Sequence, residues 1–272
     1  MTSFSSPVHH RATSQAFNRV KRSLVRRGPK RDLFYRLVCT NEIAMRLRKI
    51  KDIEEKLAEH HQYIIDDPRD RKGNWHQVFK CENEIFAEFG CGRGQFIMAL
   101  AEQNPARNYI AVEGRSGVIL RALEKAAKAK LDNIVFVKEY IHDVHEYFDK
   151  DELAGIYLNF CDPWPKGSHA PRRLTHSRFL NGYRQILKQG SCIEFKTDND
   201  GLFAFAKREF EKSGMQLLRS TEDLHCTEYG AKNVTTEYED KFKAQGKKVH
   251  YCMVVSAHIR QDQDSRTFPS AV

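Results

Sequence analysis

The sequence contains no hydrophobic run of the length that a membrane helix requires. Such a helix takes about 18 to 20 consecutive apolar residues, and no stretch of the 272 residues approaches that length. The first 31 residues also lack the apolar segment of a secretory signal peptide. We therefore expect a cytoplasmic protein with no membrane partner.

Paired cysteines are missing as well. The chain has seven cysteines, an odd number, and no two of them are separated by two residues. This pattern indicates neither a disulfide framework nor a zinc site. His142 and His145 are three residues apart, but no cysteine or carboxylate at ligand spacing accompanies them. We expect small reduced core cysteines and no metal.

Acidic residues are absent from the first 31 positions, which carry eight basic ones. The net charge of +9 lies entirely within the first 80 residues, because the rest of the chain has as many acidic as basic side chains. A basic arm of this kind can bind a polyanion such as RNA. It can equally be a solvated, disordered tail. Both interpretations remain open.

The length and the 40% content of hydrophobic residues predict one sizeable domain with an appendage. We expect a basic, flexible extension over residues 1–44 and a helix with a linker over 45–74. The helix itself is predicted at 41–62, where isoleucine and leucine recur at spacings of three and four residues. The main domain should cover residues 75–260, followed by a polar tail at 261–272.

Strand-like and helical segments alternate through the main domain. Strands are predicted at 84–89, 108–113, 133–137, 155–160 and 190–196. Helices are predicted between and after them, at 95–103, 116–131, 142–149, 176–187 and 200–213. This alternation is typical of an α/β fold with a doubly wound, mostly parallel sheet. Further strands at 215–220 and 249–257 would add an antiparallel pair at the C-terminal edge and make seven strands.

Polar groups follow four of these strands, where a doubly wound sheet binds its ligands. The first strand leads into a glycine loop, Gly90-x-Gly92-x-Gly94, with Gln95 where a dinucleotide fingerprint places its third glycine. That mismatch argues against NAD. The loop could be a tight strand-to-helix turn and nothing more. With Glu113 about 20 residues on to accept from ribose hydroxyls, and Glu88 to meet positive charge, it fits S-adenosylmethionine.

A second motif, Asp162-Pro163-Trp164-Pro165, follows the fourth strand. The prolines stiffen the backbone and remove amide donors, so the carboxylate and the indole would be held toward the cleft. A stiff acid beside an aromatic plane can orient a base that has left its stack. The alternative is a structural turn with a core-filling tryptophan.

Two further segments allow two interpretations each. The basic side chains of Lys166, His169, Arg172 and Arg173 come directly after this motif, and they suit phosphate contacts or a plain solvated loop. Residues 236–239, of sequence Thr-Glu-Tyr-Glu, open a helix. These residue types suit N-terminal capping of the helix and substrate binding equally well.

At these residues the chain resembles the bacterial tRNA (guanine-N(7)-)-methyltransferase family, over about 45–256. The matching segments lie at 72–79, 88–96, 109–113, 157–174, 195–198 and 236–242, and the most specific is Asn159-Phe160-Cys161-Asp162-Pro163-Trp164-Pro165-Lys166. The resemblance implies a Rossmann-like class I methyltransferase. It would transfer a methyl group from S-adenosylmethionine to N(7) of guanine 46 in the variable loop of tRNA, forming 7-methylguanosine.

The resemblance also implies roles for individual residues. Asp162 would be the catalytic acid. The donor would be bound by Glu88, Gly90, Gly92, Gly94, Glu113, Glu139, Tyr140 and Asp162. The substrate would be bound by Lys166, Asp198, Thr236, Glu237, Tyr238 and Glu239, and the RNA by Ser168, His169, Ala170, Pro171, Arg172 and Arg173. A monomer and a homodimer are both compatible with this family.

The chain departs from the family pattern at three places. Tyr140 stands where the family has an acid for the adenine end of the donor, and Glu139 is its neighbour. Gly167, Ser168 and Pro171 replace more usual basic residues. Residues 1–44 have no counterpart in the compact family core. The rival interpretations are an amino-methyltransferase acting on adenine or cytosine, and an RNA-binding protein with a degenerate donor pocket.

Overall fold

The computed structural model describes residues 50–256. The expected basic extension at 1–44 and polar tail at 261–272 lie outside this range, as does the first part of the helix expected at 41–62. Within the described residues, no helix is both long and apolar enough to cross a membrane.

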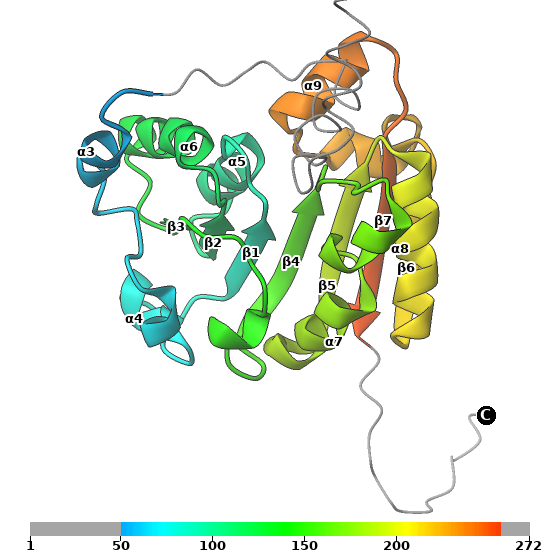
Figure 1. Ribbon diagram of the computed structural model, residues 1–272, viewed down its shortest axis with the longest axis horizontal. Helices are drawn as coiled ribbons and strands as arrows, with labels where there is room; N and C mark the ends of the chain where they lie inside the picture. The colour runs from blue at the N-terminus through cyan, green and yellow to red at the C-terminus, as the bar shows by residue number, and fades with distance from the viewer. Residues whose placement is uncertain (1–49, 257–272) are drawn as a thin grey trace, which may run out of the picture. The chain divides into compact units, whose positions relative to one another are not determined.

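A seven-stranded sheet with the strand order β3-β2-β1-β4-β5-β7-β6 forms the centre of the domain (Figure 1). Its strands lie within three residues of the predicted ranges. They are β1 (Ile85–Phe89), β2 (Asn108–Val112), β3 (Ile134–Val137), β4 (Leu153–Asn159), β5 (Leu187–Thr197), β6 (Met215–Thr221) and β7 (His250–Ser256).

Strand directions confirm the predicted fold class. β1 pairs in parallel with β2 and β4, β2 with β3, and β4 with β5. β7 runs antiparallel to both of its neighbours, β5 and β6. The antiparallel elements therefore stand at the C-terminal edge, as expected. β1, β2 and β3 are buried along their whole length, which is why their sequences are nearly continuous apolar runs.

Helices cover the two faces of the sheet in separate groups (Figure 1). α5 (Gln95–Gln103) and α6 (Ser116–Ala129) pack on one face, and α7 (Ser177–Ile186) and α8 (Asp200–Lys212) on the other. β1 serves both cores because its side chains alternate: Phe86 joins the α5/α6 side, while Ala87 and Phe89 join the α7/α8 side. α9 (Glu237–Ala244) precedes β7.

The helix predicted at 41–62 is confirmed for part of its described range and is wrong at its C-terminal end. The helix there, α3, spans only Ile53–Ala58. The chain then turns, and Ile64 forms a parallel bridge with Phe136 of β3, with hydrogen bonds from the Ile65 amide to the Phe136 carbonyl (2.9 Å) and from the Phe136 amide to the Tyr63 carbonyl (2.7 Å). Pairing with the open edge of β3 ends the helix, although the apolar spacing is that of a longer one.

The helix predicted at 142–149 is also wrong. This crossover contains only a 3-10 turn, η2 (Val144–Glu146), opened by the Asp143 side chain, which accepts from the His145 amide at 2.9 Å. Val144, Tyr147 and Phe148 are buried. Their spacing of three and four residues matches a helix, but a single turn presents the same spacing, so the pattern alone does not distinguish them.

Residues 65–79 pack onto the start of the domain. η1 (Pro68–Arg71) leads to the short helix α4 (Trp75–Phe79). Trp75 is completely buried, stacks on Phe148 with ring centroids 5.7 Å apart, and donates its indole N–H to the Tyr147 carbonyl at 2.9 Å. This single side chain anchors the segment beside the crossover between β3 and β4.

Candidate active site

The predicted site residues gather where the strand order reverses, between β1 and β4. β2 and β3 lie on one side of this point and β5 on the other, so the loops after β1 and β4 diverge and leave a crevice at the carboxyl ends of the strands. Gly90 begins the loop after β1, and Asp162 lies in the loop after β4. The topology thus brings together the two motifs that the sequence singled out.

Three glycines of the loop after β1 have left-handed backbone conformations, with φ of 83° at Gly90, 59° at Gly92 and 74° at Gly94. A Cβ atom at Gly90 or Gly92 would meet no other atom within 4 Å, so the space above them is open. A Cβ at Gly94 would stand 2.9 Å from the Ala122 Cβ. The first two glycines therefore border the crevice, whereas the third lets α5 pack closely on α6.

Glu88, in β1, is a buried carboxylate with one uncommitted oxygen. Its Oε1 accepts a hydrogen bond from the Asn159 side chain at 2.7 Å. Its Oε2 is buried and has no hydrogen-bond partner among the described residues. Burial raises the pKa of Glu88 to about 7, although the Asn159 hydrogen bond and the positive charge of Lys196 act in the opposite direction. An oxygen in this state is ready to receive a ligand donor.

This raised pKa predicts a pH-dependent stability. The folded protein keeps a proton on Glu88 where the unfolded chain has released it, so the free energy of unfolding falls as pH rises from 4.5 to about 7. The fall attributable to Glu88 is about 3 kcal/mol. Urea unfolding of the protein and of Glu88→Gln at pH 5 to 8 measures it, because the variant lacks this titration. Parallel pH curves for the two proteins would contradict the prediction.

Glu113, directly after β2, ties the glycine loop to the next helix. Its Oε2 accepts from the Gly92 amide at 3.2 Å, and its Oε1 accepts from the Arg115 amide at 2.9 Å and from the Arg115 Nε at 3.1 Å. The carboxylate is buried, while the Arg115 side chain is more than half exposed. Glu113 is therefore held in place at the crevice by groups of its own loop.

Glu139 and Tyr140 lie after β3 and differ in their surroundings. Both oxygens of Glu139 accept from the Arg69 guanidinium at 3.0 Å, and the Tyr147 hydroxyl donates to it as well. Burial alone would raise the pKa of Glu139, but these donors outweigh it and lower the pKa. Tyr140 is 60% exposed, and its ring lies over Gly114, where a Cβ would stand 2.5 Å from the ring atoms. The tyrosine, not the glutamate, offers a free surface.

The loop after β4 is held in an unusual backbone conformation. Phe160 and Trp164 have positive φ values of 48° and 42°, which residues with a side chain rarely adopt. Arg173 stabilises the loop by donating to the carbonyls of Pro163 and Trp164, at 3.0 Å each. Asp162 lies between these two residues. Its backbone is therefore held by the strained conformations on either side and by the hydrogen bonds from Arg173.

The charges of Asp162 and Asp198 both act on Tyr238. Burial first, and then the negative charges of Asp198 and Asp162, raise the pKa of Tyr238. The charge of Asp162 also acts on Arg115, at the glycine-loop side. Both carboxylates are exposed, and Tyr238 is 48% exposed. Two predicted residues from the loops after β4 and β5 are therefore within electrostatic reach of a third, in α9.

The remaining predicted substrate residues shape the start of α9. Thr236 and Glu239 form a capping box, with the Glu239 amide donating to the Thr236 hydroxyl at 3.0 Å. Glu239 is fully buried and pairs with the buried Lys196 ammonium at 3.0 Å. Glu237 pairs with Arg93 at 3.3 Å and with Lys125. These three residues position Tyr238 and contact the body of the domain.

The predicted RNA-binding loop contains η3 (Gly167–Arg172). Ser168, Pro171 and Arg172 are exposed, while His169 and Ala170 are half-buried. The Arg172 guanidinium lies 5.0 Å from the centre of the Trp164 ring, and His169 meets the same ring edge-on at 5.7 Å. We predicted that the Trp164 indole faces the cleft. Both of these ring contacts are instead with residues of its own loop. Lys166 is exposed, and its carbonyl accepts from the His169 amide at 2.9 Å.

Some residues of the site escaped the sequence analysis. Asn159 lies in the quoted motif, but its bond to Glu88 was not foreseen, although a buried amide in an apolar strand was a usable signal. Arg115 could not be identified from the sequence, because its role depends on its hydrogen bonds to the Glu113 carboxylate in the folded chain. Among residues 50–256, no group of three or more histidine, cysteine, aspartate or glutamate side chains could hold a metal ion.

These features fit a nucleoside donor. Gly90 and Gly92 have open space beside them, the Glu113 carboxylate is bonded to the Gly92 amide, and the uncommitted Glu88 oxygen belongs to the strand that leads into this loop. A ligand with a positive charge and vicinal hydroxyls would satisfy both acids. S-adenosylmethionine has these groups.

Comparisons with known proteins agree with the geometry. A family model described as a putative methyltransferase matches residues 82–252. A tRNA (guanine-N(7)-)-methyltransferase of Clostridioides difficile is 46% identical over 209 residues, which are 76% of this chain and 97% of the relative. The enzyme of the same name from Lachnoclostridium phytofermentans is 45% identical over 206 residues, 76% of this chain and 96% of the relative.

Solved structures support the fold alone. An antibiotic-related methyltransferase matches with a TM-score of 0.52 and 20% identity, over 71% of this chain and 95% of that chain. The 16S rRNA methyltransferase KamB matches with a TM-score of 0.50 and 14% identity, over 68% and 93%. The Rossmann-like class I fold is therefore confirmed. Because the curated relatives are matched over nearly their whole length, the chain belongs to the tRNA (guanine-N(7)-)-methyltransferase family.

Proposed function

We propose that this protein transfers a methyl group from S-adenosylmethionine to N(7) of a guanine in tRNA, forming 7-methylguanosine. Position 46 of the variable loop is the proposed target. The observation that carries the proposal is that Glu88 in β1, Glu113 directly after β2 and Asp162 in the loop after β4 all act electrostatically on the Cys161 thiol, whose sulfur lies 3.9 Å from the Phe89 carbonyl before the glycine loop. The names of the curated relatives support the same activity.

The donor would lie along the glycine loop. When bound, it supplies a methyl group on a positively charged sulfur. Glu113 would accept from a ribose hydroxyl, for which its Oε2 retains one lone pair beside the one given to Gly92, whereas its Oε1 accepts from both the amide and the Nε of Arg115. The uncommitted oxygen of Glu88 would accept from a donor N–H and favour its positive charge. Gly90, Gly92 and Gly94 would allow the close backbone approach.

The guanine would be oriented by Asp162, with Asp198 and Tyr238 beside it. Guanine N(7) has a free lone pair and bears no proton, so no residue has to act as a general base. The base becomes positively charged as the methyl group arrives, and the Asp162 carboxylate would offset that charge. Alignment of nucleophile, methyl and sulfur would supply most of the acceleration, up to roughly 7 to 11 kcal/mol for ideal orientation.

The side chains of Lys166 and Arg172 would bind phosphates of the tRNA. Both side chains are exposed on the loop beside the crevice. Arg173 would contribute differently, because its guanidinium is committed to the loop carbonyls. The basic arm at residues 1–31 lies outside the described residues, and its contribution to RNA binding stays a prediction.

Tyr140 would form a wall of the adenine pocket, in place of the acid that the family has there. Its exposed ring, seated on Gly114 next to Glu113, suits stacking against a base. Tyr140→Ala should weaken binding of S-adenosylhomocysteine roughly threefold to tenfold, and Tyr140→Phe should leave it unchanged. Calorimetry with the purified variants measures both. Equal affinities for the alanine variant and the unmodified protein would show that the ring has no part in donor binding.

One experiment tests the proposed function directly. The protein is incubated with an unmodified tRNA transcript and S-adenosylmethionine labelled in its methyl group, and the nucleosides of the digested RNA are identified. Labelled 7-methylguanosine at one position is expected. Labelled methyladenosine or methylcytidine would favour the amino-methyltransferase alternative, and failure to bind the donor in calorimetry would favour a non-enzymatic RNA-binding protein.

The location and assembly of the enzyme are also part of the proposal. A cytoplasmic location suits an enzyme whose curated relatives are named for tRNA. The choice between monomer and homodimer is left to sedimentation of the purified chain.

A further inference from the structure

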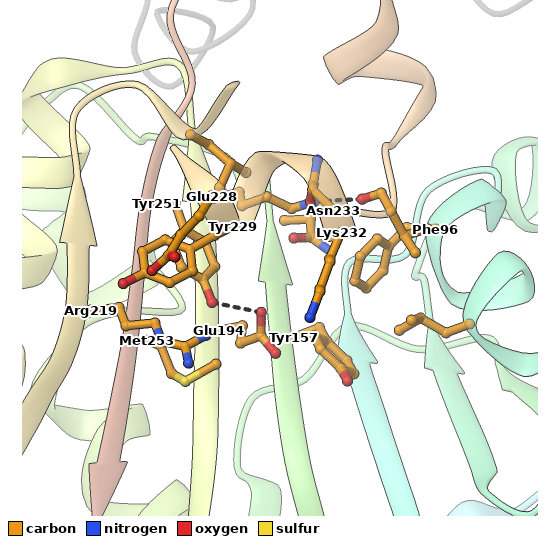
Figure 2. Close-up of a pocket in the computed structure, with 15 residues that line it drawn as sticks. Phe96, Tyr157, Glu194, Arg219, Glu228, Tyr229, Lys232, Asn233, Tyr251 and Met253 are labelled. Carbon is orange, nitrogen blue, oxygen red and sulfur yellow. Dashed lines mark hydrogen bonds between the residues drawn. The ribbon is translucent and has the colours of Figure 1, made fainter. Parts of the chain in front are cut away.

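A second cavity of about 420 Å³ lies on the face of the sheet that carries α5 (Figure 2). Its floor is formed by side chains of β4, β5, β6 and β7, and the segment 224–234 covers it. Four aromatic rings line the walls: Phe96, Tyr157, Tyr229 and Tyr251. The volume is within the range of sites that bind small ligands, about 300 to 1,000 Å³.

Glu194 presents a carboxylate to this cavity. Its Oε2 accepts from the Tyr251 hydroxyl at 2.9 Å, the dashed contact in Figure 2. Its Oε1 accepts no hydrogen bond from residues 50–256. Burial first, and then the negative charge of Glu194, raise the pKa of Tyr157. A carboxylate between two tyrosines is thus partly satisfied and has room for further donors.

Positive charges stand at the rim of the cavity. The Arg219 guanidinium lies 4.5 Å from the centre of the Tyr229 ring. The Lys232 ammonium points into the cavity above Glu194 and Tyr157 (Figure 2). Both side chains are exposed, so they can contact a phosphate without a large cost of desolvation.

The cavity is separate from the proposed donor crevice. None of Gly90, Glu113 and Asp162 lines it. Lys196, which lines the cavity, donates to Asn233 at 3.0 Å and to the Val234 carbonyl at 2.9 Å, and Asn159, which also lines it, donates to Glu88 at 2.7 Å. A ligand in the cavity would therefore lie beside the methylation site without filling it.

We propose that this cavity binds an unpaired guanine nucleotide of the tRNA, distinct from the guanine that is methylated. Proteins read single-stranded RNA by stacking splayed bases on aromatic rings and by hydrogen bonds to base edges, which are the groups that this cavity offers. Arg219 and Lys232 would contact the phosphate of the same nucleotide. The assignment to tRNA rests on the proposed function.

The Glu194 carboxylate would make the cavity selective for guanine. The Watson–Crick edge of guanine presents two adjacent donors, N1–H and the N2 amino group, and a carboxylate can accept both. Adenine and cytosine present one amino group next to an acceptor, and uracil one N–H between two acceptors. Glu194 would repel those acceptors, so the cavity would disfavour the other three bases in addition to attracting guanine.

Binding of 5′-GMP to the full chain tests this inference. Calorimetry is run with saturating S-adenosylhomocysteine, which keeps GMP out of the donor crevice. GMP should bind, AMP and UMP should bind at least tenfold more weakly, and Glu194→Gln should weaken GMP at least tenfold. Glu222→Gln, a change at an exposed carboxylate outside the cavity, is the matched control and should have no effect. Should Glu194→Gln not fold, Arg219→Ala serves in its place, with a weakening of several-fold.

Further binding measurements distinguish a nucleotide of the tRNA from a free nucleotide and from binding at the methylation site. An unmodified tRNA transcript should displace GMP, and Glu194→Gln should weaken tRNA binding several-fold without changing the affinity for S-adenosylhomocysteine. The inference fails if GMP does not bind, if GMP, AMP and UMP bind alike, or if Asp162→Asn abolishes GMP binding while Glu194→Gln preserves it. GMP that tRNA cannot displace would indicate a free nucleotide instead. Because these are binding measurements, they stand apart from the nucleoside analysis, whose failure would overturn the proposed function alone.

Discussion

Asp162→Ala is expected to lower kcat for tRNA methylation by about 100-fold to 1,000-fold, the range seen when one preorganised electrostatic group is removed. The carboxylate is exposed in the crevice and its charge reaches both Tyr238 and Arg115, so the developing charge on guanine would lie close to it. Its backbone is held by Arg173 and not by the side chain itself. The fold should therefore change little.

Single-turnover kinetics with a tRNA transcript measure this loss. Asp162→Asn keeps the shape of the side chain and removes its charge, so it separates orientation of the guanine from stabilisation of charge. Asp132→Ala, at an exposed aspartate between α6 and β3, is the control and should retain full activity. Turnover of Asp162→Ala within a factor of three of the unmodified protein would refute the assigned role.

Lys196→Met is expected to destabilise the protein by about 3 to 5 kcal/mol, the range for breaking a buried ion pair from one side. Lys196 is 3% exposed and Glu239 is not exposed at all, and their contact of 3.0 Å joins the end of β5 to the start of α9. Without the ammonium, the buried Glu239 carboxylate loses its lysine partner, and Asn233 and Val234 lose a donor. Methylation should fall too, because α9 carries Tyr238.

Urea unfolding followed by circular dichroism measures the change. The double variant Lys196→Met with Glu239→Gln removes both charges and should be less destabilised than the sum of the single variants. Lys212→Met breaks the pair with Glu209 (3.2 Å), in which the lysine is 68% exposed. This control should cost less than about 1 kcal/mol. Equal losses for Lys196→Met and Lys212→Met would mean that the buried pair adds nothing to stability.

The strands and most of the helices could be predicted because their signals are local. The apolar runs of β1, β2 and β3 are buried on both sides, so their sequences alone mark them as strands. α5 was predicted to the residue, since Gly94 before it and the apolar spacing within it define both ends. The helix at 142–149 could not be predicted correctly, because Val144, Tyr147 and Phe148 suit one turn as well as two.

The sequence alone determined which residues stand at the carboxyl ends of the strands, and with them the fold class, the family and the crevice. The folded chain decided what those residues do. Asn159 leaves one Glu88 oxygen free from 71 positions away, Arg69 occupies Glu139 from 70 positions away, and Lys196 neutralises Glu239 from 43. The reason is that the state of a carboxylate depends on burial and on the donors around it, and both arise only when distant segments of the chain pack together.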